Sequence, residues 1–444
     1  MGEIKVNSDK LWKAQTQRSF NNFKIGTEKM PIELIYAIVE LKKAIALVNG
    51  ENNKLDLDKS HAIAKACDLI LQGNYDDQFP LSVWQTGSGT QTNMNCNEVI
   101  SSLAKIKFNQ EVHPNDHVNK SQSTNDVFPS AIHLASYKLT VNKLIPNLKV
   151  LIKEFDNFLN RLDETIKVGR THLQDATPVK VKQEVGAWKY ALERVLNQIN
   201  SALEEISNLG IGGTAVGTGI NTYEGYSDKV VEKLNNITGY NLKTSVNKFY
   251  SLASKNEILV FHSSLNALAV ELLKIGNDIR WLASGPRAGI GEYIIPSNEP
   301  GSSIMPGKVN PTQIEALSMV CAQVYGNQAS VSFAASQGNF QLNVYMPQIA
   351  YNTLQSINLL SDICKSLSDH LVNGMSIDKD VISYNLENSL MTVTALNPYI
   401  GYDNSAKLAK YAHENKMNLF EANRELKILD DEKLIEYLNF DKMV

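Results

Sequence analysis

Five long runs of helical periodicity constrain the fold of this chain more than any other feature. Apolar residues recur at spacings of three and four from Asp126 to about Leu162. Four similar runs follow, at 183–209, 254–284, 312–336 and 347–372. Each run is longer than a common globular helix, and a helix that is apolar on more than one face buries its second face against other helices or subunits. The pattern predicts a mainly α fold with a central bundle of five long helices, assembled into a homo-oligomer.

Shorter elements flank these runs and predict a division into three domains. Before the first run, the periodicity indicates helices at 32–48 and 61–71 and a polar loop at 84–97. After the last run, short helices are expected near 380–389, 405–413 and 419–426. We therefore expect an N-terminal cap domain at 1–125, the bundle domain at 126–380 and a small helical domain at 381–444.

Charge and cysteine content exclude several classes of function. A net charge of −4 argues against nucleic acid or an anionic membrane as the main partner. The four cysteines lie far apart without a C-x-x-C pair, so neither a disulfide framework nor a zinc cluster is indicated. The N-terminus lacks the apolar core of a signal peptide, and the most apolar run, 258–282, is interrupted by charged residues. These features predict a cytoplasmic protein with a buried core helix at 258–282.

The segment 301–311, GSSIMPGKVNP, combines loop glycines, two serines and a lysine directly before a helix. Asn310 suits the N-cap of that helix and Pro311 its first position. The free amides of a helix start, together with the Lys308 ammonium, favour an anion nearby. Held by such groups, Ser302 could act as an oxyanion and remove a proton from carbon. An ordinary surface loop before a well-capped helix is the alternative interpretation.

Three further segments carry candidate functional groups. The stretch 168–178 places His172 in a connection between two long helices, as a candidate acid or base, although a lone histidine is more often structural. The stretch 86–98 is a glycine loop rich in hydroxyls and amides, which suit a small dianion, and 121–126 is similar. Both could also be plain turns, because these residue types are the usual turn formers.

Two other patterns favour weaker interpretations. His113 and His117 have the spacing of metal ligands, but Pro114 disfavours the helix that would align them, so no metal site is expected. The segment 209–219 contains G-x-G-x-x-A, with Asp228 near the distance of a ribose-binding acid. A dinucleotide fingerprint must follow a strand, whereas this one follows a helical run, so we expect a turn near the site and no cofactor.

Together these motifs resemble the signatures of the fumarase/aspartase superfamily, from about Trp84 to Gly401, and their wording is closest to the class II fumarases. The resemblance implies reversible hydration of fumarate to (S)-malate in the tricarboxylic acid cycle, without metal or organic cofactor. It assigns the base to Ser302 and the handling of water to His172 and Glu315. The other substrate-binding positions that it implies are Ser88, Gly89, Thr90, Ser123, Thr124, Asn125, Thr171, Ser303, Lys308, Val309 and Asn310.

The same resemblance implies a second dicarboxylate site and a particular assembly. The second site falls on His113, Pro114, Asn115 and Asp116. The family commonly has arginine where this chain has Gln110, which puts anion binding there in doubt. The assembly implied is a homotetramer whose active sites are each shared by three subunits. Aspartate ammonia-lyase, of the same fold, is the nearest alternative activity, and a non-catalytic helical scaffold is the alternative from another class.

Overall fold

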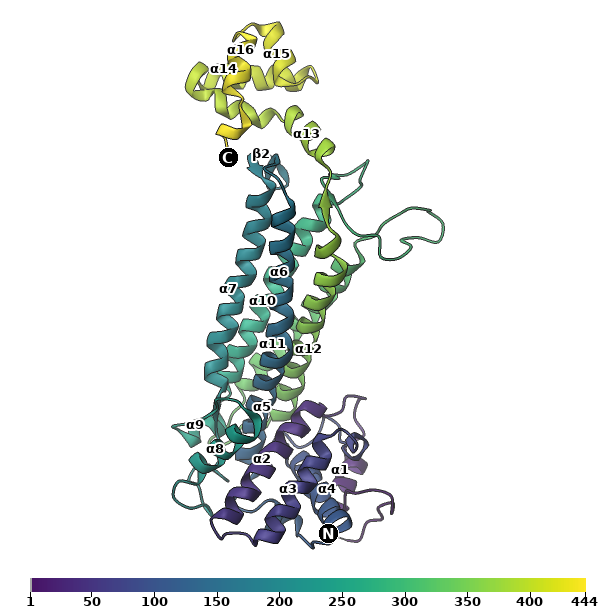
Figure 1. The fold of residues 1–444 in the computed structure, drawn as a ribbon, viewed down its shortest axis with the longest axis vertical. Coiled ribbons are helices and arrows are strands. Elements are labelled where there is room, and N and C mark those ends of the chain that lie inside the picture. Colours follow the sequence, from purple (N-terminus) through teal and green to yellow (C-terminus); the bar gives the residue numbers. More distant parts are fainter. Residues whose placement is uncertain (1) are drawn as a thin grey trace. The chain divides into compact units, whose positions relative to one another are not determined.

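A computed structural model describes residues 2–444 and shows a predominantly helical chain (Figure 1). The chain forms two compact units, each built from three separate segments. The first unit comprises the segment ending at Pro146 together with Val195–Val270 and Met319–Asp362. The second comprises Asn147–Arg194, Glu271–Ser318 and Ile363–Val444. Residues distant in sequence therefore share a core within each unit.

The five predicted long helices are confirmed, with ends close to those expected. The first run is α5 (Thr124–Leu139), a π-helical turn η3 (Thr140–Leu144) and α6 (Ile145–Arg161). The others are α7 (Val181–Ile206), α10 (Asn256–Leu282), α11 (Thr312–Ala335) and α12 (Met346–His370). In the second unit, α6 and the parts of α10, α11 and α12 that belong to it bury Leu151, Phe155, Leu272, Ile279, Leu317 and Leu367 against one another. The long helices lie side by side in Figure 1. The apolar face read from the sequence is the face that packs.

Most of the remaining elements are short, although α2, α4 and α14 have 20, 19 and 18 residues. The helices are α1 (Ala14–Asn22), α2 (Ile32–Glu51), α3 (Leu57–Leu71), η1 (Asp76–Gln78), α4 (Thr90–Phe108), η2 (Pro114–Val118), α8 (Tyr226–Thr238), α9 (Lys248–Ala253), η4 (Val372–Gly374), α13 (Lys379–Asn388), η5 (Leu390–Leu396), α14 (Asn397–Glu414), α15 (Leu419–Leu426), α16 (Asp431–Tyr437) and η6 (Phe440–Lys442). The strands form three two-stranded sheets: β1 (Ile166–Thr171) with β2 (Gln174–Lys180), β3 (Asn208–Leu209) with β4 (Lys243–Thr244), and β5 (Tyr293–Ile294) with β6 (Ser376–Ile377).

The prediction of a polar loop at 84–97 is wrong from Thr90 onward, because α4 begins at that residue. Its asparagines are buried and paired: Asn95 donates to the Gln78 carbonyl, and Asn93 donates to the Thr124 hydroxyl. The helix therefore buries amides where an ordinary core helix buries apolar side chains. Such partners come from elsewhere in the chain, so the local pattern could not show them.

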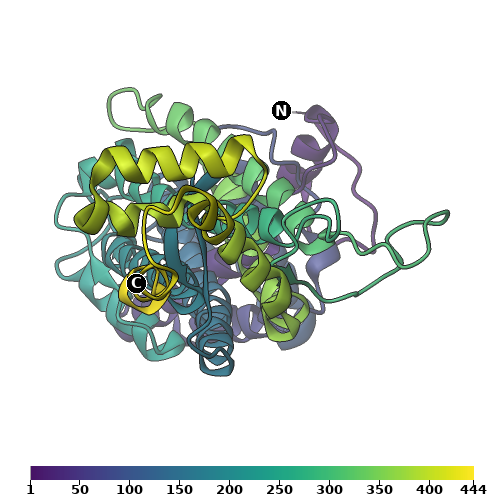
Figure 2. The same ribbon diagram turned by 90° about the horizontal axis from the view of Figure 1, so that it is seen from above.

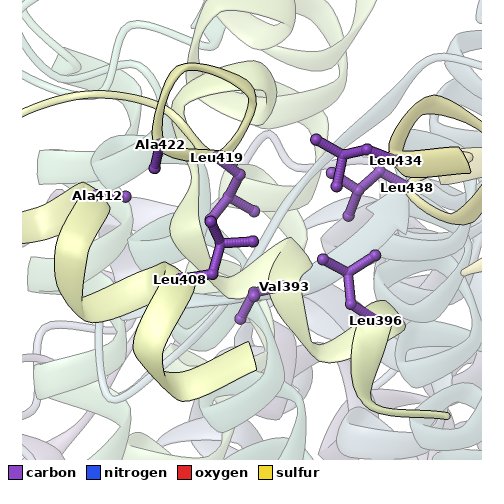
Figure 3. Packing of buried hydrophobic residues seen from close by; sticks show 8 residues of the cluster. All are labelled: Val393, Leu396, Leu408, Ala412, Leu419, Ala422, Leu434 and Leu438. Carbon is purple, nitrogen blue, oxygen red and sulfur yellow. The ribbon is translucent and has the colours of Figure 1, made fainter. Parts of the chain in front are cut away.

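The C-terminal helices enclose a small hydrophobic cluster (Figure 3). It consists of Val393, Leu396, Leu408, Ala412, Leu419, Ala422, Leu434 and Leu438. Figure 2 shows the yellow-green α14 and the C-terminus of the chain from above. Gly401 interrupts α14 with a φ of 75°, a left-handed conformation that glycine adopts at little cost. The C-terminal residues thus carry their own apolar core.

One helix, α10, is long and apolar enough in composition to cross a membrane. Half of its most apolar window is buried inside the structure, and Phe261, Leu265 and Leu268 have no exposed surface. A core helix passes the same compositional test, and the burial of α10 agrees with the core helix expected from the sequence.

Candidate active site

The loop that contains Ser302 connects α10 to α11 and projects from the ends of those helices (Figures 1 and 2). Two bonds close its tip: the Gly301 amide donates to the Lys308 carbonyl at 3.1 Å, and the Asn310 side-chain amide donates to the Gly301 carbonyl at 2.6 Å. A Cβ at Gly301 would lie 2.2 Å from the Lys308 oxygen, so only glycine permits this closure. Residues 301–310 therefore form one closed ring of chain.

Inside this ring, two backbone amides point at the Ser302 hydroxyl. The amides of Ile304 and Met305 donate to Ser302 Oγ at 3.3 and 3.2 Å. Ser302 is partly exposed, and Ser303 is exposed. Hydrogen bonds donated to an oxygen favour its charged form, because they stabilise negative charge more than they stabilise a neutral hydroxyl. These two amides would therefore stabilise negative charge on Ser302 Oγ.

A cavity of about 520 Å³ lies against the end of this loop. Lys308, Val309 and Asn310 line it, together with Arg280 from the last turn of α10. Lys308 is exposed, so its charge is available to a ligand. In the sequence, Arg280 is one of the charged residues that interrupt the apolar run at 258–282. The local signal that could have indicated a role for Arg280 is its position in the last turn of a helix, because helix C-termini favour cations.

The start of α11 differs by one residue from the expected cap. The Pro311 carbonyl accepts from the amides of Ile314 and Glu315, at 2.9 and 3.0 Å, so Pro311 occupies the N-cap position. Asn310 was expected there, but its side chain instead closes the loop on Gly301. Glu315 lies exposed in the first turn of the helix, as expected.

His172 lies at the tip of a β-hairpin, which the sequence interpretation did not predict. Thr171 pairs with Gln174 across β1 and β2, leaving a two-residue turn of His172 and Leu173. Both residues have positive φ, 56° and 60°, as a type I′ turn requires. Asn-Gly usually occupies such turns, and the absence of that signal explains the missed hairpin. His172 is exposed, and its left-handed backbone is a form of strain that clusters at functional sites.

The glycine loop at 86–90 is in the first unit and packs closely against its neighbours. A Cβ at Gly87 would lie 1.4 Å from the Val344 carbonyl, and one at Gly89 would lie 2.2 Å from the Phe128 ring. The hydroxyls of Ser88 and Thr90 are hydrogen-bonded at 2.7 Å. Only glycines fit these positions, so the two hydroxyls are held in a fixed place.

The second hydroxyl-rich segment forms the N-terminus of α5. Ser123 caps the helix by accepting from the Asn125 amide, while the Ser123 amide donates to Asp126. Asp126 also accepts from the amides of Gly212 and Thr214, at 2.8 and 3.0 Å. Burial raises the pKa of Asp126, although these backbone amides act in the opposite direction. The 209–219 segment is therefore a turn held beside Ser123, as expected, although the two-residue strand β3 precedes it.

The residues at 113–116 are exposed or half-exposed, and they contact one another. The Asp116 amide donates to His113 Nδ1, and the His113 amide donates to His117 Nδ1. Asn115 and Asp116 line a cavity of about 720 Å³ that Ser123 also lines. The proposed second site and one proposed substrate segment therefore open into the same cavity. Within residues 2–444, no group of three or more metal-ligating side chains is arranged to hold a metal ion.

The candidate residues divide between the two units. The first unit holds Ser88, Gly89, Thr90, Ser123, Thr124, Asn125 and residues 113–116. The second holds Thr171, His172, Ser302, Ser303, Lys308, Val309, Asn310 and Glu315. Only part of each set is brought together: Lys308, Val309 and Asn310 line one cavity in the second unit, and Ser123, Asn115 and Asp116 line another in the first.

Comparisons with known proteins agree on one family. A family described as Lyase matches residues 2–326, and one described as Fumarase C C-terminus matches residues 393–444. Fumarate hydratase class II of Bacillus subtilis (strain 168) is 52% identical over 449 residues, covering 100% of this chain and 97% of the relative. The protein of that name from Helicobacter pylori (strain ATCC 700392 / 26695) is also 52% identical, over 450 residues, with the same coverage. The crystal structure of class II fumarase from Schistosoma mansoni has a TM-score of 0.96 and 41% identity, and the match covers 100% of this chain and 97% of that one.

Proposed function

The chain belongs to the class II fumarase family of lyases, and we propose that Ser302, His172 and Glu315 perform its chemistry. The enzyme is a hydro-lyase that interconverts fumarate and (S)-malate. One observation carries the proposed roles: the two backbone amides that donate to Ser302 Oγ inside the closed loop.

Ser302 acts as the base in the dehydration direction. The hydrogen next to a malate carboxylate is very weakly acidic, so its removal needs a strong base and positive groups for the resulting charge. As an alkoxide, Ser302 Oγ takes this proton and becomes a hydroxyl, and the electron pair stays on the substrate carbon. The amides of Ile304 and Met305 stabilise the alkoxide, and the exposed Lys308 ammonium offers charge to the carboxylate. In the hydration direction, the Ser302 hydroxyl returns the proton to carbon.

His172 and Glu315 handle the water. His172 protonates the departing hydroxyl during dehydration and accepts a proton from the attacking water during hydration, while Glu315 polarises that water. The exposed hairpin tip and the exposed first turn of α11 support these roles, since both side chains are accessible to a ligand. The substrate carboxylates are held by Ser88, Gly89, Thr90, Ser123, Thr124, Asn125, Thr171, Ser303, Lys308, Val309 and Asn310. A second dicarboxylate site falls on His113, Pro114, Asn115 and Asp116.

Membership of this family implies a dicarboxylate substrate and an oligomer. We infer the finer assembly, a homotetramer whose active sites each draw on three subunits. Large apolar side chains exposed on the long helices support it, among them Met319 (69% exposed) and Phe333 (58%). The protein is cytoplasmic in this proposal, with no nucleic-acid or membrane partner. The separate cluster of Figure 3 supports residues 381–444 as a domain, beside those proposed at 1–125 and 126–380.

Incubation with fumarate, with and without ammonium, tests the activity. Loss of the alkene absorbance with malate as the product is expected, and it should not depend on ammonium. Ammonium-dependent aspartate formation would identify an aspartate ammonia-lyase instead, and no turnover at all would favour a scaffold. Ser302→Ala should abolish turnover and leave the oligomer intact, whereas Ser303→Ala should retain measurable turnover. Near-normal activity of Ser302→Ala would remove Ser302 from the role of base.

A further inference from the structure

Lys42, on α2, is a fully buried lysine in the first unit. Its ammonium donates to Asn119 Oδ1 at 3.2 Å and to Gln122 Oε1 at 3.0 Å, both neutral amide oxygens. Among residues 2–444, no carboxylate forms an ion pair with it. Burying a cation without a charged partner is costly, and burial lowers the pKa of Lys42 to about 8. A group that costs stability in this way is a candidate for a role in function.

Both amide partners of Lys42 line the cavity of about 720 Å³ described above. Ser123, a proposed substrate contact, lines the same cavity. The Lys42 ammonium is therefore separated from the cavity by one layer of amide side chains. The charged residues that line this cavity are Lys54, Asp116 and Lys120. The substrate contacts proposed at 88–90 and 123–125 carry no charge of their own.

A chain of hydrogen bonds through Asn119 and Asn93 connects Lys42 to Thr124. An ammonium can only donate, so Asn119 must present its oxygen to Lys42. The same oxygen accepts from the Asn93 side-chain amide at 3.2 Å, and that amide also donates to Thr124 Oγ1 at 3.0 Å. Because Thr124 Oγ1 accepts in this contact, its own hydrogen is left to donate in another direction. A carboxylate oxygen is a suitable acceptor for it.

We propose that Lys42 is a positioning residue for the dianionic substrate: it supplies positive potential behind the neutral carboxylate-binding residues and sets the Thr124 hydroxyl as a donor. This inference rests on the proposed function, since it takes a dicarboxylate as the ligand. Its role differs from that of Lys308, which lies exposed in the other unit.

Each helix packed against α2 presents a group that could titrate near Lys42. These groups are Cys67 on α3, Cys96 on α4, Asp126 on α5 and Tyr226 on α8. Burial raises the pKa of both thiols and of the Tyr226 phenol, so these three stay neutral at and above neutral pH. Burial raises the pKa of Asp126, while the backbone amides of Ser123, Gly212 and Thr214 act in the opposite direction. Between pH 7 and 9 two lysines near Asp126 change charge: Lys42, and Lys248 on α9, whose pKa burial also lowers to about 8. The Lys42→Met variant is therefore needed to assign the effect to Lys42.

The sign of the pH effect follows from the charge of Lys42. Below its pKa of about 8 the ammonium is charged and attracts the dianion, and above it the attraction is lost. Dicarboxylate affinity should therefore be highest below pH 8 and decrease as the pH rises past it. A dianion that prefers the charged form also raises the pKa of Lys42 in the complex, by linkage.

The test compares Lys42→Met with Lys43→Met, a matched control on the same helix. Lys43 is partly exposed and pairs with Asp68 at 2.6 Å, outside the buried amide cluster. The measurements are KM and kcat for fumarate and malate, the Kd of succinate by calorimetry between pH 6 and 9.5, and the melting temperature. We expect Lys42→Met to raise KM and the succinate Kd about tenfold at pH 7, which corresponds to about 1.4 kcal/mol. The kcat should change by less than about threefold, and the melting temperature should stay the same or rise, because a buried unpaired cation is removed.

Two results with Lys42→Met would overturn the inference. One is a KM and succinate Kd of Lys42→Met within twofold of wild type. The other is a lower melting temperature with unchanged affinity, which would make the role structural. The succinate Kd of the wild type should rise above pH 8, whereas the Kd of Lys42→Met should not change with pH. A wild-type Kd that does not change with pH would also contradict the inference, and this measurement does not depend on the variant being folded. If the wild type binds succinate but does not hydrate fumarate, the proposed function fails while the calorimetric test of Lys42 still stands.

Discussion

The buried carboxylate of Glu292 should be the most sensitive single charge in the second unit. Glu292 has no exposed surface and accepts from both terminal nitrogens of Arg170, at 2.6 and 3.0 Å. Lys167 lies 3.2 Å away and Asn385 donates at 3.1 Å. Arg170 is on β1, two residues before His172, and Glu292 precedes the Ser302 loop in the chain. The perturbation that isolates the charge is Glu292→Gln, which keeps the shape of the side chain.

The expected cost is about 3 kcal/mol. Removing one partner of a buried ion pair typically costs about 3–5 kcal/mol, because the other charge is left without compensation. The lower end applies here for two reasons. Lys167 keeps a second partner, Glu184, at 2.9 Å, and the Arg170 side chain is 17% exposed, so water reaches it.

The pH dependence gives a second signature. Burial by itself would raise the pKa of Glu292, but the bonds from Arg170 and the charges of Lys167 and Arg170 outweigh it, and the net pKa lies below the usual 4.5. A carboxyl with a depressed folded pKa stabilises the protein at neutral pH, and that contribution is lost as the pH falls through the folded pKa. The stability difference between wild type and Glu292→Gln should therefore shrink as the pH falls below about 4.5.

The assay is urea denaturation at pH 7, followed by the same measurement at acidic pH. Glu164→Gln is the control, because Glu164 pairs with Lys180 and Lys182 on the surface, where such pairs contribute little, and its loss should be barely measurable. Glu292→Leu combined with Arg170→Met should recover part of the stability, since two apolar groups leave no unpaired charge between them. A loss of less than about 1 kcal/mol in the unfolding free energy of Glu292→Gln would refute the reasoning. A double variant that is no more stable than Glu292→Gln would refute it as well.

Two further predictions concern the hairpin turn and the C-terminal cluster. Leu173→Gly should stabilise the protein by about 1 kcal/mol, because glycine adopts a φ of 60° without the cost that leucine incurs. Denaturant unfolding measures this gain, and a loss of stability would contradict the assigned turn. Leu408→Ala should destabilise the C-terminal residues by about 2–5 kcal/mol, since Leu408 has no exposed surface in the cluster of Figure 3. Hydrogen exchange should show faster opening of 393–438 with little change in α2, and equal protection in both proteins would show that the cluster does not hold these helices.

The long helices could be predicted because their signal is local. Apolar residues at spacings of three and four determine which face packs, whatever the partner. The start of α4 could not be read in this way, because buried asparagines replace the apolar face and find their partners at Gln78 and Thr124. The hairpin at His172 was missed for a related reason, since its two left-handed residues are neither glycine nor asparagine.

By itself, the sequence determined the helical architecture and the identity of the groups that could do chemistry, because periodicity and motif wording are properties of neighbouring residues. It indicated a serine, a lysine and a histidine, and it favoured Ser302 through resemblance to a family. The tertiary structure decided what surrounds these groups. The amides on Ser302 Oγ depend on how the loop closes, and the burial of Lys42 depends on helices far apart in the chain. Hydrogen bonding and desolvation act through space, so they belong to the folded chain.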